Sequence, residues 1–512
     1  MAAAGLDRAA VAATRPRHPA PVRVEDVRAW AGDDARLELA GTARPVTGIT
    51  LDSRRVLPGD VYAALPGARA HGSAFVAQAA EAGAVAVLTD AAGAAPATEA
   101  GLPTVVVEAP RSVLGAVSAG VYGDPAAALR MVGVTGTQGK TTVTRLLDGG
   151  LDAAGIRSAV VGTVGTRIAG VDVRTALTTP EAPDLHGLFA LMREQEVVGC
   201  AMEVSSHALV LGRVDGVVFD VAVFLNLGRD HLDFHKDVED YFQAKAGLFT
   251  PERARLGLVD VDDEHGRRLA GEAPIPVRTL SARGRAADWT ATDVRTAPDG
   301  SRFTVRGPRG LAVPASVPLP GDFNVSNALA AIAAAVEAGY DAEQVAAGIA
   351  ASGGVPGRLE RMTTGDEGFT VVVDYAHKPD ALEAVLRTLR PVTEGRLIVV
   401  IGAGGDRDRG KRPVMGRIAS ELADLVVVTD DNPRTEDPAQ IRREVLAGTD
   451  GPADVLEIGD RHAAIAEAIG RAGDGDVVLV AGKGHETGQE IGAVVHPFDD
   501  RDVVRELLGG GA

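Results

Sequence analysis

Apolar runs alternate with helix-like segments along most of the chain, and this alternation predicts α/β structure in three blocks. The first block reaches residue 127 and includes residues 74–90, where a helix-like stretch leads into a strand-like one. The second block carries long apolar runs at residues 158–164, 199–205 and 220–227. Strands that are apolar on both faces are typical of a parallel sheet covered by helices on each side.

The third block, from residue 355, repeats this pattern, which predicts a doubly wound, Rossmann-like sheet. Three of its apolar runs end in polar loops, at residues 402–412, 430–434 and 482–486. Ligands of such sheets bind beyond the carboxyl ends of the strands. We therefore expect these three loops to line one binding cleft.

The length of 512 residues is too great for one hydrophobic core. We expect a disordered leader at residues 1–20 and α/β domains at residues 21–127, 128–354 and 355–512. The net charge of -18 argues against nucleic-acid binding, and no apolar run reaches the length of a membrane span. We therefore expect a cytoplasmic protein without membrane insertion. We also expect a monomer, although this does not follow from these features. The single cysteine, Cys200, excludes an intrachain disulfide and is expected to be a small buried hydrophobe.

The clearest chemical motif is "VTGTQGKTT", residues 134–142, between an apolar run and a helix-like segment. Backbone N–H groups of such a turn, together with a helix N-terminus, bind phosphate oxygens. Lys140 adds a positive charge, and the Thr141 hydroxyl suits magnesium. Val134 takes the place of the first glycine of the usual motif, so the loop is a variant. The pattern predicts nucleotide binding and leaves the use of the nucleotide open.

The chain as a whole resembles the Mur ligases. It carries, in the order seen in that family, eleven motifs: GTQGKTT, LTTPE, MEVSSHAL, LNLGRDHLDFH, YFQAKAGLF, GDFNVSNALAA, VPGRLE, DYAHKPDAL, GGDRDRGKRP, DNPR and GKGHE. It most resembles the MurE branch, the UDP-N-acetylmuramoyl-tripeptide synthetases, and its DNPR resembles the members that add meso-2,6-diaminopimelate. The resemblance implies three domains, a central P-loop ATPase-like sheet, ATP as co-substrate and Mg²⁺ as cofactor.

The implied reaction is an early cytoplasmic step of bacterial peptidoglycan synthesis. It joins an amino group of diaminopimelate to the D-glutamate carboxylate of UDP-MurNAc-L-Ala-D-Glu, while ATP becomes ADP and phosphate. A carboxylate is a poor acyl donor because the attacking amine would have to expel an oxide. Transfer of the γ-phosphoryl group first creates an acyl phosphate, and this transfer depends mainly on charge neutralisation and positioning.

The resemblance also assigns roles to individual residues. The implied catalytic residues are Lys140, Glu203, His231 and Lys245, and the implied metal ligands are Thr141, Glu203, His231 and Lys245, the last as a carbamate. The implied ATP-binding residues are Gly136, Thr137, Gln138, Gly139, Lys140, Thr141, Thr142, Asn327 and Arg358. The residues implied for UDP-MurNAc-dipeptide are Ser53, Thr178, Thr179, Ser205 and Arg213, and those for diaminopimelate are Arg407, Asp431, Asn432, Pro433, Arg434, Gly482 and Glu486.

The residue patterns alone leave several of these roles open. A lone lysine on an amphipathic helix, such as Lys245, is usually a solvated surface residue. Glu203 is equally well a strand-end carboxylate bonded to backbone or a metal ligand. Arg434 has a stronger physical reason, because diaminopimelate differs from lysine by a second carboxylate, which a guanidinium can bind through two parallel hydrogen bonds. A site built this way should reject lysine, which would leave the arginine unpaired.

Three alternatives remain: the same ligation with L-lysine, another Mur or folylpolyglutamate-type amide ligase, and a nucleotide switch without ligase activity. DNPR argues against lysine addition, and "LDSRRVLPGDVYAALPG" argues against a folate enzyme. The four implied catalytic residues argue against a switch. Leu211, Leu225 and Asp260 stand where the family often has Gln, Thr and Asn, so substrate contacts at these positions are in doubt.

Overall fold

A computed structural model describes residues 8–38, 44–67, 69–228, 230–297, 299–363 and 367–509. The chain divides into two compact units. The first contains the residues up to 290 with residues 305–313 and 329–348, and the second contains residues 291–304, 314–328 and 349 onward. Among the described residues, no helix is long and apolar enough to cross a membrane.

The N-terminal part of the first unit is built on a five-stranded sheet in the order β1-β5-β4-β3-β2. Its strands are β1 (Arg36–Glu38), β2 (Gly48–Thr50), β3 (Asp60–Ala64), β4 (Ala86–Thr89) and β5 (Thr104–Val106). Its helices are α2 (Val24–Trp30), α3 (Val76–Ala82), α4 (Ala91–Glu99) and α5 (Pro110–Val121). All strand pairs are parallel except that of β1 with β5, so the α/β structure expected for this block is confirmed.

The segment before this sheet is ordered over the residues that the structure describes. It contains helix α1 (Arg8–Ala12), and the buried Arg15 places Nη1 2.6 and 2.7 Å from the two carboxylate oxygens of Asp60 on β3. The backbone N–H groups of Arg17 and His18 donate to the Glu194 carboxylate. The prediction of a disordered leader is therefore wrong for residues 8–20, because a buried ion pair fixes them; residues 1–7 lie outside the described residues.

A second sheet of the first unit carries strands in the order β13-β12-β11-β6-β10-β7-β8-β9. These are β6 (Arg130–Thr135), β7 (Ser158–Gly162), β8 (Gly165–Ile168), β9 (Val171–Val173), β10 (Gly199–Glu203), β11 (Val221–Phe224), β12 (Gly257–Asp260) and β13 (Val277–Ser281). The strands from β13 to β7 are parallel, as expected. The antiparallel edge strands β8 and β9 were not predicted from the sequence.

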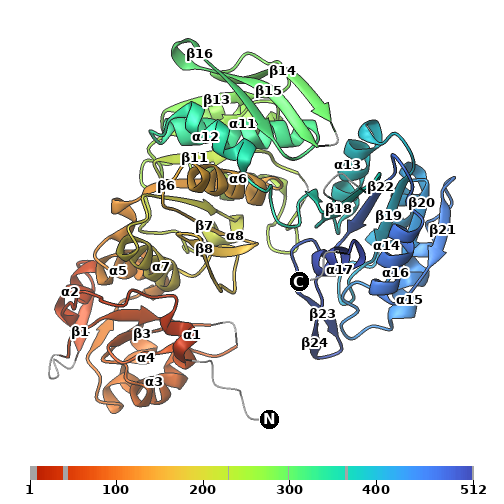
Figure 1. The fold of residues 1–512 in the computed structure, drawn as a ribbon. Helices are drawn as coiled ribbons and strands as arrows, with labels where there is room; N and C mark the ends of the chain where they lie inside the picture. The colour runs from red at the N-terminus through yellow and green to blue at the C-terminus, as the bar shows by residue number, and fades with distance from the viewer. Residues whose placement is uncertain are drawn as a thin grey trace. The chain divides into compact units, whose positions relative to one another are not determined.

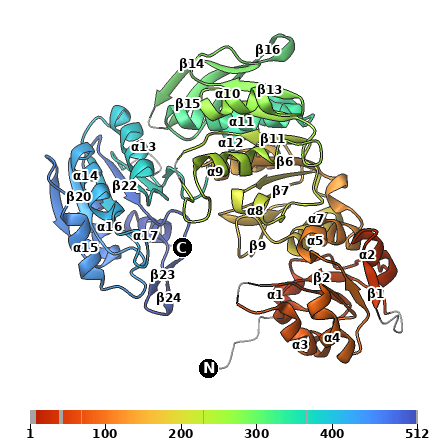
Figure 2. The ribbon, with the colours of Figure 1, turned by 180° about the vertical axis from the view of Figure 1, so that it is seen from behind.

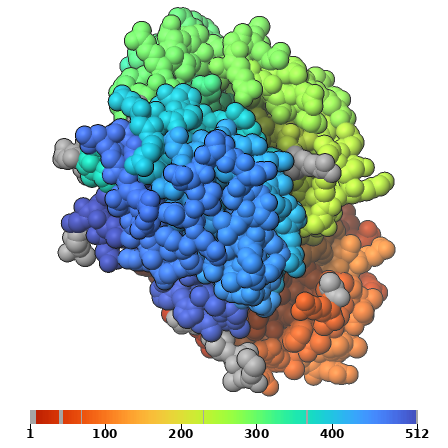
Figure 3. All heavy atoms as spheres, turned by 90° about the vertical axis from the view of Figure 1, so that its right-hand side faces the viewer, coloured from red at the N-terminus to blue at the C-terminus, as the bar shows by residue number. Residues whose placement is uncertain are grey.

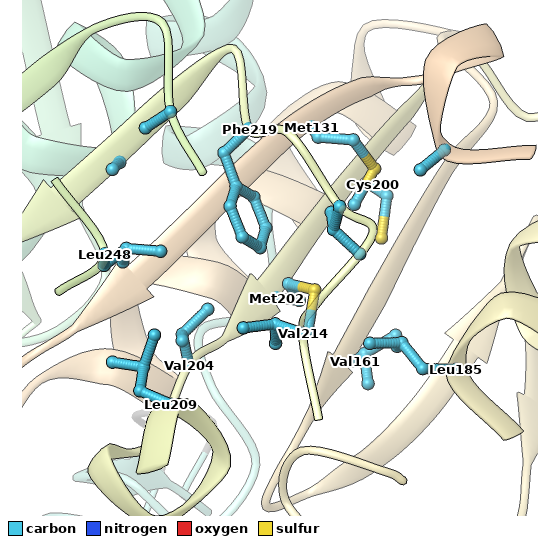
Figure 4. Packing of buried hydrophobic residues seen from close by; sticks show 14 of the residues in the cluster. Met131, Val161, Leu185, Cys200, Met202, Val204, Leu209, Val214, Phe219 and Leu248 are labelled. Carbon is cyan, nitrogen blue, oxygen red and sulfur yellow. The ribbon is translucent and has the colours of Figure 1, made fainter. Parts of the chain in front are cut away.

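The central part of the chain, which carries this second sheet, also contains further strands and helices. The strands are β14 (Trp289–Ala297), β15 (Gly300–Gly307) and β16 (Leu311–Val317), and the helices are α6 (Lys140–Ala153), α7 (Ala182–Glu194), α8 (Ser206–Val210), α9 (Val238–Ala246), α10 (Glu264–Glu272), α11 (Asp322–Glu337) and α12 (Ala342–Ala351). An apolar core between the sheet and α7 includes Cys200, which is 2% exposed and lies beside Met131 (Figure 4). Burial raises the pKa of this thiol, in line with its predicted role as a small hydrophobe.

The second unit is built on a six-stranded sheet in the order β17-β18-β22-β19-β20-β21, parallel except for β17 (Figures 1 and 2). Its strands are β17 (Glu360–Arg361), β18 (Thr370–Asp374), β19 (Leu397–Ile401), β20 (Leu425–Val428), β21 (Asp454–Glu457) and β22 (Val477–Ala481). Its helices are α13 (Pro379–Leu389), α14 (Lys411–Leu422), α15 (Pro438–Leu446), α16 (Arg461–Gly470) and α17 (Asp500–Leu507). A two-stranded sheet pairs β23 (Gly488–Ile491) with β24 (Val494–Pro497).

Alternate residues of these strands pack with α16 and α17 into one core, as in a doubly wound sheet. The C-terminal residues that form this sheet and its helices are blue in the space-filling view, where their side chains form a continuous packed surface (Figure 3). Because β22, β19 and β20 are neighbours, the polar loops that follow them emerge at one edge of the sheet. The expectation that these loops come together is confirmed below by their contacts.

Candidate active site

The phosphate loop joins β6 to α6. Gly136 (φ +153°) and Gly139 (φ +89°) have backbone conformations that favour glycine. Lys140, the first residue of α6, folds back so that its ammonium donates to the carbonyls of Gly136 (2.6 Å) and Thr137 (3.1 Å), while Thr142 is buried in the first turn. The helix N-terminus and this ammonium together form an anion site.

Asn226, just after β11, fixes the shape of the loop. Its Oδ1 accepts from the Gln138 N–H at 2.9 Å, its Nδ2 donates to the Gln138 carbonyl at 3.2 Å, and its own carbonyl accepts from the Thr137 N–H at 3.0 Å. The sequence reasoning missed Asn226. The available signal was its place as a polar residue directly after the buried strand β11, which neighbours β6.

Glu203 ends strand β10 and is 1% exposed. Its Oε1 accepts from the Thr141 hydroxyl at 2.9 Å and from the Thr163 N–H at 2.8 Å, and its Oε2 accepts from the Thr163 hydroxyl at 3.0 Å. The parallel pairing of β10 with β6 brings Glu203 to the start of the phosphate loop. Carboxylate and hydroxyl oxygens are the metal ligands that a hard cation such as Mg²⁺ prefers, and here they lie close together. Thr163 was not named from the sequence.

Lys245 on α9 is buried, at 1% exposure, so the typical reading of such a lysine as a surface residue is wrong here. Its ammonium donates to the Gly136 carbonyl at 2.9 Å and lies over the Tyr241 ring. Burial and then the nearby charge of Lys140 lower its pKa well below the usual value, and Asp230 opposes this shift. The neutral amine is therefore more accessible at Lys245 than at a solvated lysine.

His231 is connected to the phosphate loop through Tyr241, whose ring it contacts and whose hydroxyl reaches the loop. Its ring is 6.0 Å from the Tyr241 ring and 4.9 Å from that of His207, and the Tyr241 hydroxyl is 3.2 Å from Thr137 Oγ1. In the part of the chain that the structure describes, no group of three or more His, Cys, Asp or Glu side chains could hold a metal. The structure therefore brings Thr141 and Glu203 together, while the ligand role of His231 stays a prediction.

Four of the residues implied for the UDP-MurNAc-dipeptide gather around the end of β10. The Thr179 hydroxyl donates to the Glu203 carbonyl at 2.8 Å and accepts from the Ser205 N–H, and Thr178 Oγ1 is 3.1 Å from Thr163 Oγ1. Arg213 is already paired, with its Nε 2.8 Å from a Glu181 oxygen. Ser53 lies instead near the first sheet, where its hydroxyl donates to Gln78.

The ATP-binding residues implied beyond residue 300 lie in the second unit. Asn327 is buried in α11 and donates to Asn324 Oδ1 at 3.3 Å. The Arg358 guanidinium lies 4.6 Å from the centre of the Tyr375 ring. Asp374, at the end of β18, accepts from two backbone N–H groups; burial raises its pKa, and Arg358 opposes the shift. Asp374 was missed, although its position at a strand end was a usable signal.

The loop at residues 431–434 meets the loop at residues 482–486, as predicted. Asn432 Nδ2 donates to Glu486 Oε2 at 2.9 Å, and the fully buried Lys483 donates to Asn432 Oδ1 at 3.0 Å and lies 3.4 Å from Glu486 Oε2. A side chain at Gly482 (φ +118°) would place Cβ 2.7 Å from an Asp431 oxygen. The close approach of the two loops therefore requires glycine at this position.

The two arginines implied for diaminopimelate both lie near Gly404. A Cβ added there would be 2.9 Å from Arg434 Nη1 and 3.9 Å from Arg407 Cγ. Arg407 is exposed, and its guanidinium donates to the Asp406 carbonyl at 3.3 Å. Arg434, which follows Pro433, donates through Nε to Glu490 at 2.9 Å and through Nη1 to the Gly405 carbonyl at 2.8 Å. The Arg434 guanidinium and the aliphatic part of Arg407 thus both lie beside Gly404.

The three residues that depart from the family pattern serve the local structure. Leu225 is buried beneath Gly136, and the Leu211 carbonyl accepts from Arg111. Asp260 accepts from the Asp262 N–H at 2.8 Å.

Three family models match this chain. They are the Mur ligase middle domain at residues 134–335, the Mur ligase glutamate ligase domain at residues 357–484, and the Mur ligase family catalytic domain at residues 45–122. The chain therefore belongs to the Mur ligase family. The expected fold class, a three-domain Mur ligase architecture with a central parallel sheet, is confirmed.

Individual relatives point to one branch of the family. The UDP-N-acetylmuramoyl-L-alanyl-D-glutamate--2,6-diaminopimelate ligase of Streptomyces coelicolor is 55% identical over 97% of this chain and 99% of its own length. The ligase of the same name from Corynebacterium glutamicum is 50% identical over 90% of this chain and 92% of its own. A solved structure of a ligase of that name has a TM-score of 0.67 at 34% identity, covering 92% of this chain and 97% of its own. The resemblance to the MurE branch is confirmed.

Proposed function

We propose that this chain adds meso-2,6-diaminopimelate to UDP-MurNAc-L-Ala-D-Glu in the cytoplasm, with cleavage of ATP to ADP and phosphate. The observation that carries the proposal is the convergence of Lys140 and Lys245 on the Gly136 carbonyl, beside the Thr141–Glu203 pair. The Lys140 ammonium, the N-terminus of α6 and an oxygen-rich site at one phosphate loop suit phosphoryl transfer between two anions.

In the first step, the D-glutamate carboxylate attacks the γ-phosphorus of ATP, and ADP leaves with the bridging oxygen. Lys140 stabilises the charge on the phosphoryl oxygens, and the N-terminus of α6 orients them. Bound Mg²⁺, held by Thr141 and Glu203, would neutralise phosphate charge at this loop.

Lys245 supplies an oxygen ligand after reaction of its neutral amine with carbon dioxide. Its lowered pKa supports this role, because only the neutral amine is nucleophilic toward carbon dioxide. The nitrogen loses a proton to solvent as the C–N bond forms, and the resulting carbamate is an anion that attracts the Lys140 ammonium. His231 completes the proposed ligand set by family resemblance.

In the second step, the amine of diaminopimelate attacks the acyl carbon, phosphate leaves with the electron pair of the C–O bond, and the new amide nitrogen loses a proton. Arg434 and Arg407 bind the distal carboxylate of the amino acid, and Glu486 receives its distal ammonium. Ser53, Thr178, Thr179, Ser205 and Arg213 bind the UDP-MurNAc-dipeptide, while Asn327 and Arg358 contact ATP.

The proposal includes the domain boundaries at residues 21–127, 128–354 and 355–512, and a monomeric enzyme. Limited proteolysis should cut near residues 127 and 354, and light scattering should give the mass of one chain. A dimer mass would contradict the monomer and leave the ligase proposal standing.

The test of the function is phosphate release by the purified protein with ATP, Mg²⁺ and UDP-MurNAc-L-Ala-D-Glu. Meso-diaminopimelate, L-lysine and no amino acid are compared. We expect release only with diaminopimelate, together with the tripeptide product by mass spectrometry. Release with lysine alone would retain the ligase and refute the selectivity, and no release with any amino acid would refute the proposed reaction.

A further inference from the structure

Glu490 on β23 is bonded to the loop at residues 431–434 by backbone and side chain. Its N–H donates to Asn432 Oδ1 at 2.9 Å, and its carbonyl accepts from the Arg434 N–H at 3.0 Å. Its carboxylate accepts from Arg434 Nε at 2.9 Å. Neighbouring residues of this segment add a bond from Gln489 Nε2 to the Asp431 carbonyl and one from the Gly492 N–H to the Arg434 carbonyl.

This support matters because Arg434 has a backbone conformation that is unfavourable for arginine. Its φ of +52° lies in the left-handed region, which a residue with a Cβ adopts at a cost of about 1 kcal/mol or more. Such a conformation persists only where surrounding contacts hold it. The bonds from Glu490 and Gly492 provide these contacts on both sides of the Arg434 peptide.

The guanidinium is held along two of its edges. Nε faces Glu490 and Nη1 faces the Gly405 carbonyl, whereas Nη2 has no hydrogen-bond partner among the described residues. A planar group fixed in this way presents its remaining N–H donors in one direction. Arg434 is therefore preorganised for an incoming carboxylate, and Glu490 provides the charged part of that preorganisation.

We propose that Glu490 is the positioning residue that sets the affinity for the second carboxylate of the amino-acid substrate, an inference that rests on the proposed function. Glu490 acts through Arg434 and does not itself contact the substrate. Without its carboxylate, the guanidinium is held at one edge only and must lose side-chain freedom when the substrate binds. The cost falls on amino-acid binding and leaves ATP binding unchanged.

The chain offers a matched control. Glu467 on α16 pairs with Arg471 Nε at 2.7 Å, and its side chain is 42% exposed, the same as that of Glu490. Glu467→Ala thus removes the same kind of ion pair from a helix surface. Glu490→Gln retains an oxygen acceptor for Arg434 Nε and removes the charge.

The experiment measures kcat, the KM of diaminopimelate and the KM of ATP for the native chain and three variants. We expect Glu490→Ala to raise the diaminopimelate KM about tenfold, the loss of one charge-assisted hydrogen bond. Glu490→Gln, which keeps the hydrogen bond without the charge, should recover part of this loss, and Glu467→Ala should match the native chain. The ATP KM, and the melting temperature measured in parallel, should stay unchanged in all three.

An unchanged diaminopimelate KM in Glu490→Ala would overturn the proposal. So would an equal rise in both KM values, or failure of Glu490→Gln to recover affinity, since each of these marks a structural effect only. If the native chain releases phosphate with lysine alone, the proposed selectivity fails, and if it releases none with any amino acid, the proposed reaction fails; in either case the role of Glu490 fails with it.

Discussion

At the phosphate loop, the ammonium groups of Lys140 and Lys245 point at one backbone carbonyl, whereas opposite charges face each other around the loops at residues 431–434 and 482–486. Lys245 forms no ion pair with any described residue, and its pKa is lowered. Lys483 is equally buried but has Glu486 and Asn432 as partners. The first region thus presents a buried ammonium without an ion pair to an incoming anion or carbamate, while the second holds its charges in place before binding.

This difference separates two ways of preparing a site. Ammonium groups gathered at the phosphate loop attract phosphate and a carboxylate strongly, and their mutual repulsion lowers stability in the free protein. Internally paired charges at residues 431–434 give up some attraction in exchange for fixed geometry, which favours selection between similar amino acids.

The largest expected effect is at Lys140. Lys140→Met should lower kcat by about 100- to 1,000-fold, because it removes a charge that stabilises the transferring phosphoryl group. Steady-state phosphate release measures this loss, and Lys236→Met, at an exposed lysine of the same unit, serves as control. Native kcat in Lys140→Met would refute the role of the loop in phosphoryl transfer.

At Lys245, carbon dioxide should matter as much as the side chain. Removal of carbon dioxide should lower the activity of the native chain by about 10- to 100-fold, and bicarbonate should restore it. This is the range seen when the groups that orient a metal ligand are lost. Lys245→Arg keeps the cation but cannot be carbamylated, so its activity should be low and indifferent to bicarbonate. Full activity in carbon dioxide-free buffer would contradict the carbamate.

Stability should change in opposite directions at the two buried lysines. Lys483→Met removes a buried ammonium that donates to Asn432 and pairs with Glu486, and should lower the free energy of unfolding by about 1 to 3 kcal/mol. Lys245→Met removes a buried cation without an ion pair and should raise it by about 1 kcal/mol. Chemical denaturation without ligands measures both, and changes of the same sign would refute the comparison.

Acid should weaken the second unit through His377. Burial, and then the charges of Lys411 and Lys378, lower the pKa of His377 from 6.5 to about 4. The unfolded chain therefore binds this proton first, so the contribution of His377 is fully present above pH 6.5 and is lost as the pH falls toward 4. At pH 5.5 the loss should be about 1 kcal/mol. Denaturation at several pH values should show a flatter pH dependence in His377→Asn, and an unchanged slope would contradict the assignment.

The sequence predicted the sheets and the loops at their edges because long apolar strands and strand-end polar residues leave a clear pattern. It could not predict contacts that depend on tertiary packing. The burial of Lys245 depends on how α9 packs, and the edge strands β8 and β9 are short and partly exposed. Thr163 and Glu490 act on loops distant in the chain, so no local spacing marks them, and Asn226 is marked only by its place after a buried strand.

The ion pair between Arg15 and Asp60 ties the N-terminal segment to β3 across 45 residues of sequence. Replacement of either residue alone would leave a buried charge without its partner. The two positions should therefore change together in evolution, so that related chains lacking the arginine also lack the aspartate. Covariation at this pair would mark, from sequences alone, which homologues share this N-terminal anchor.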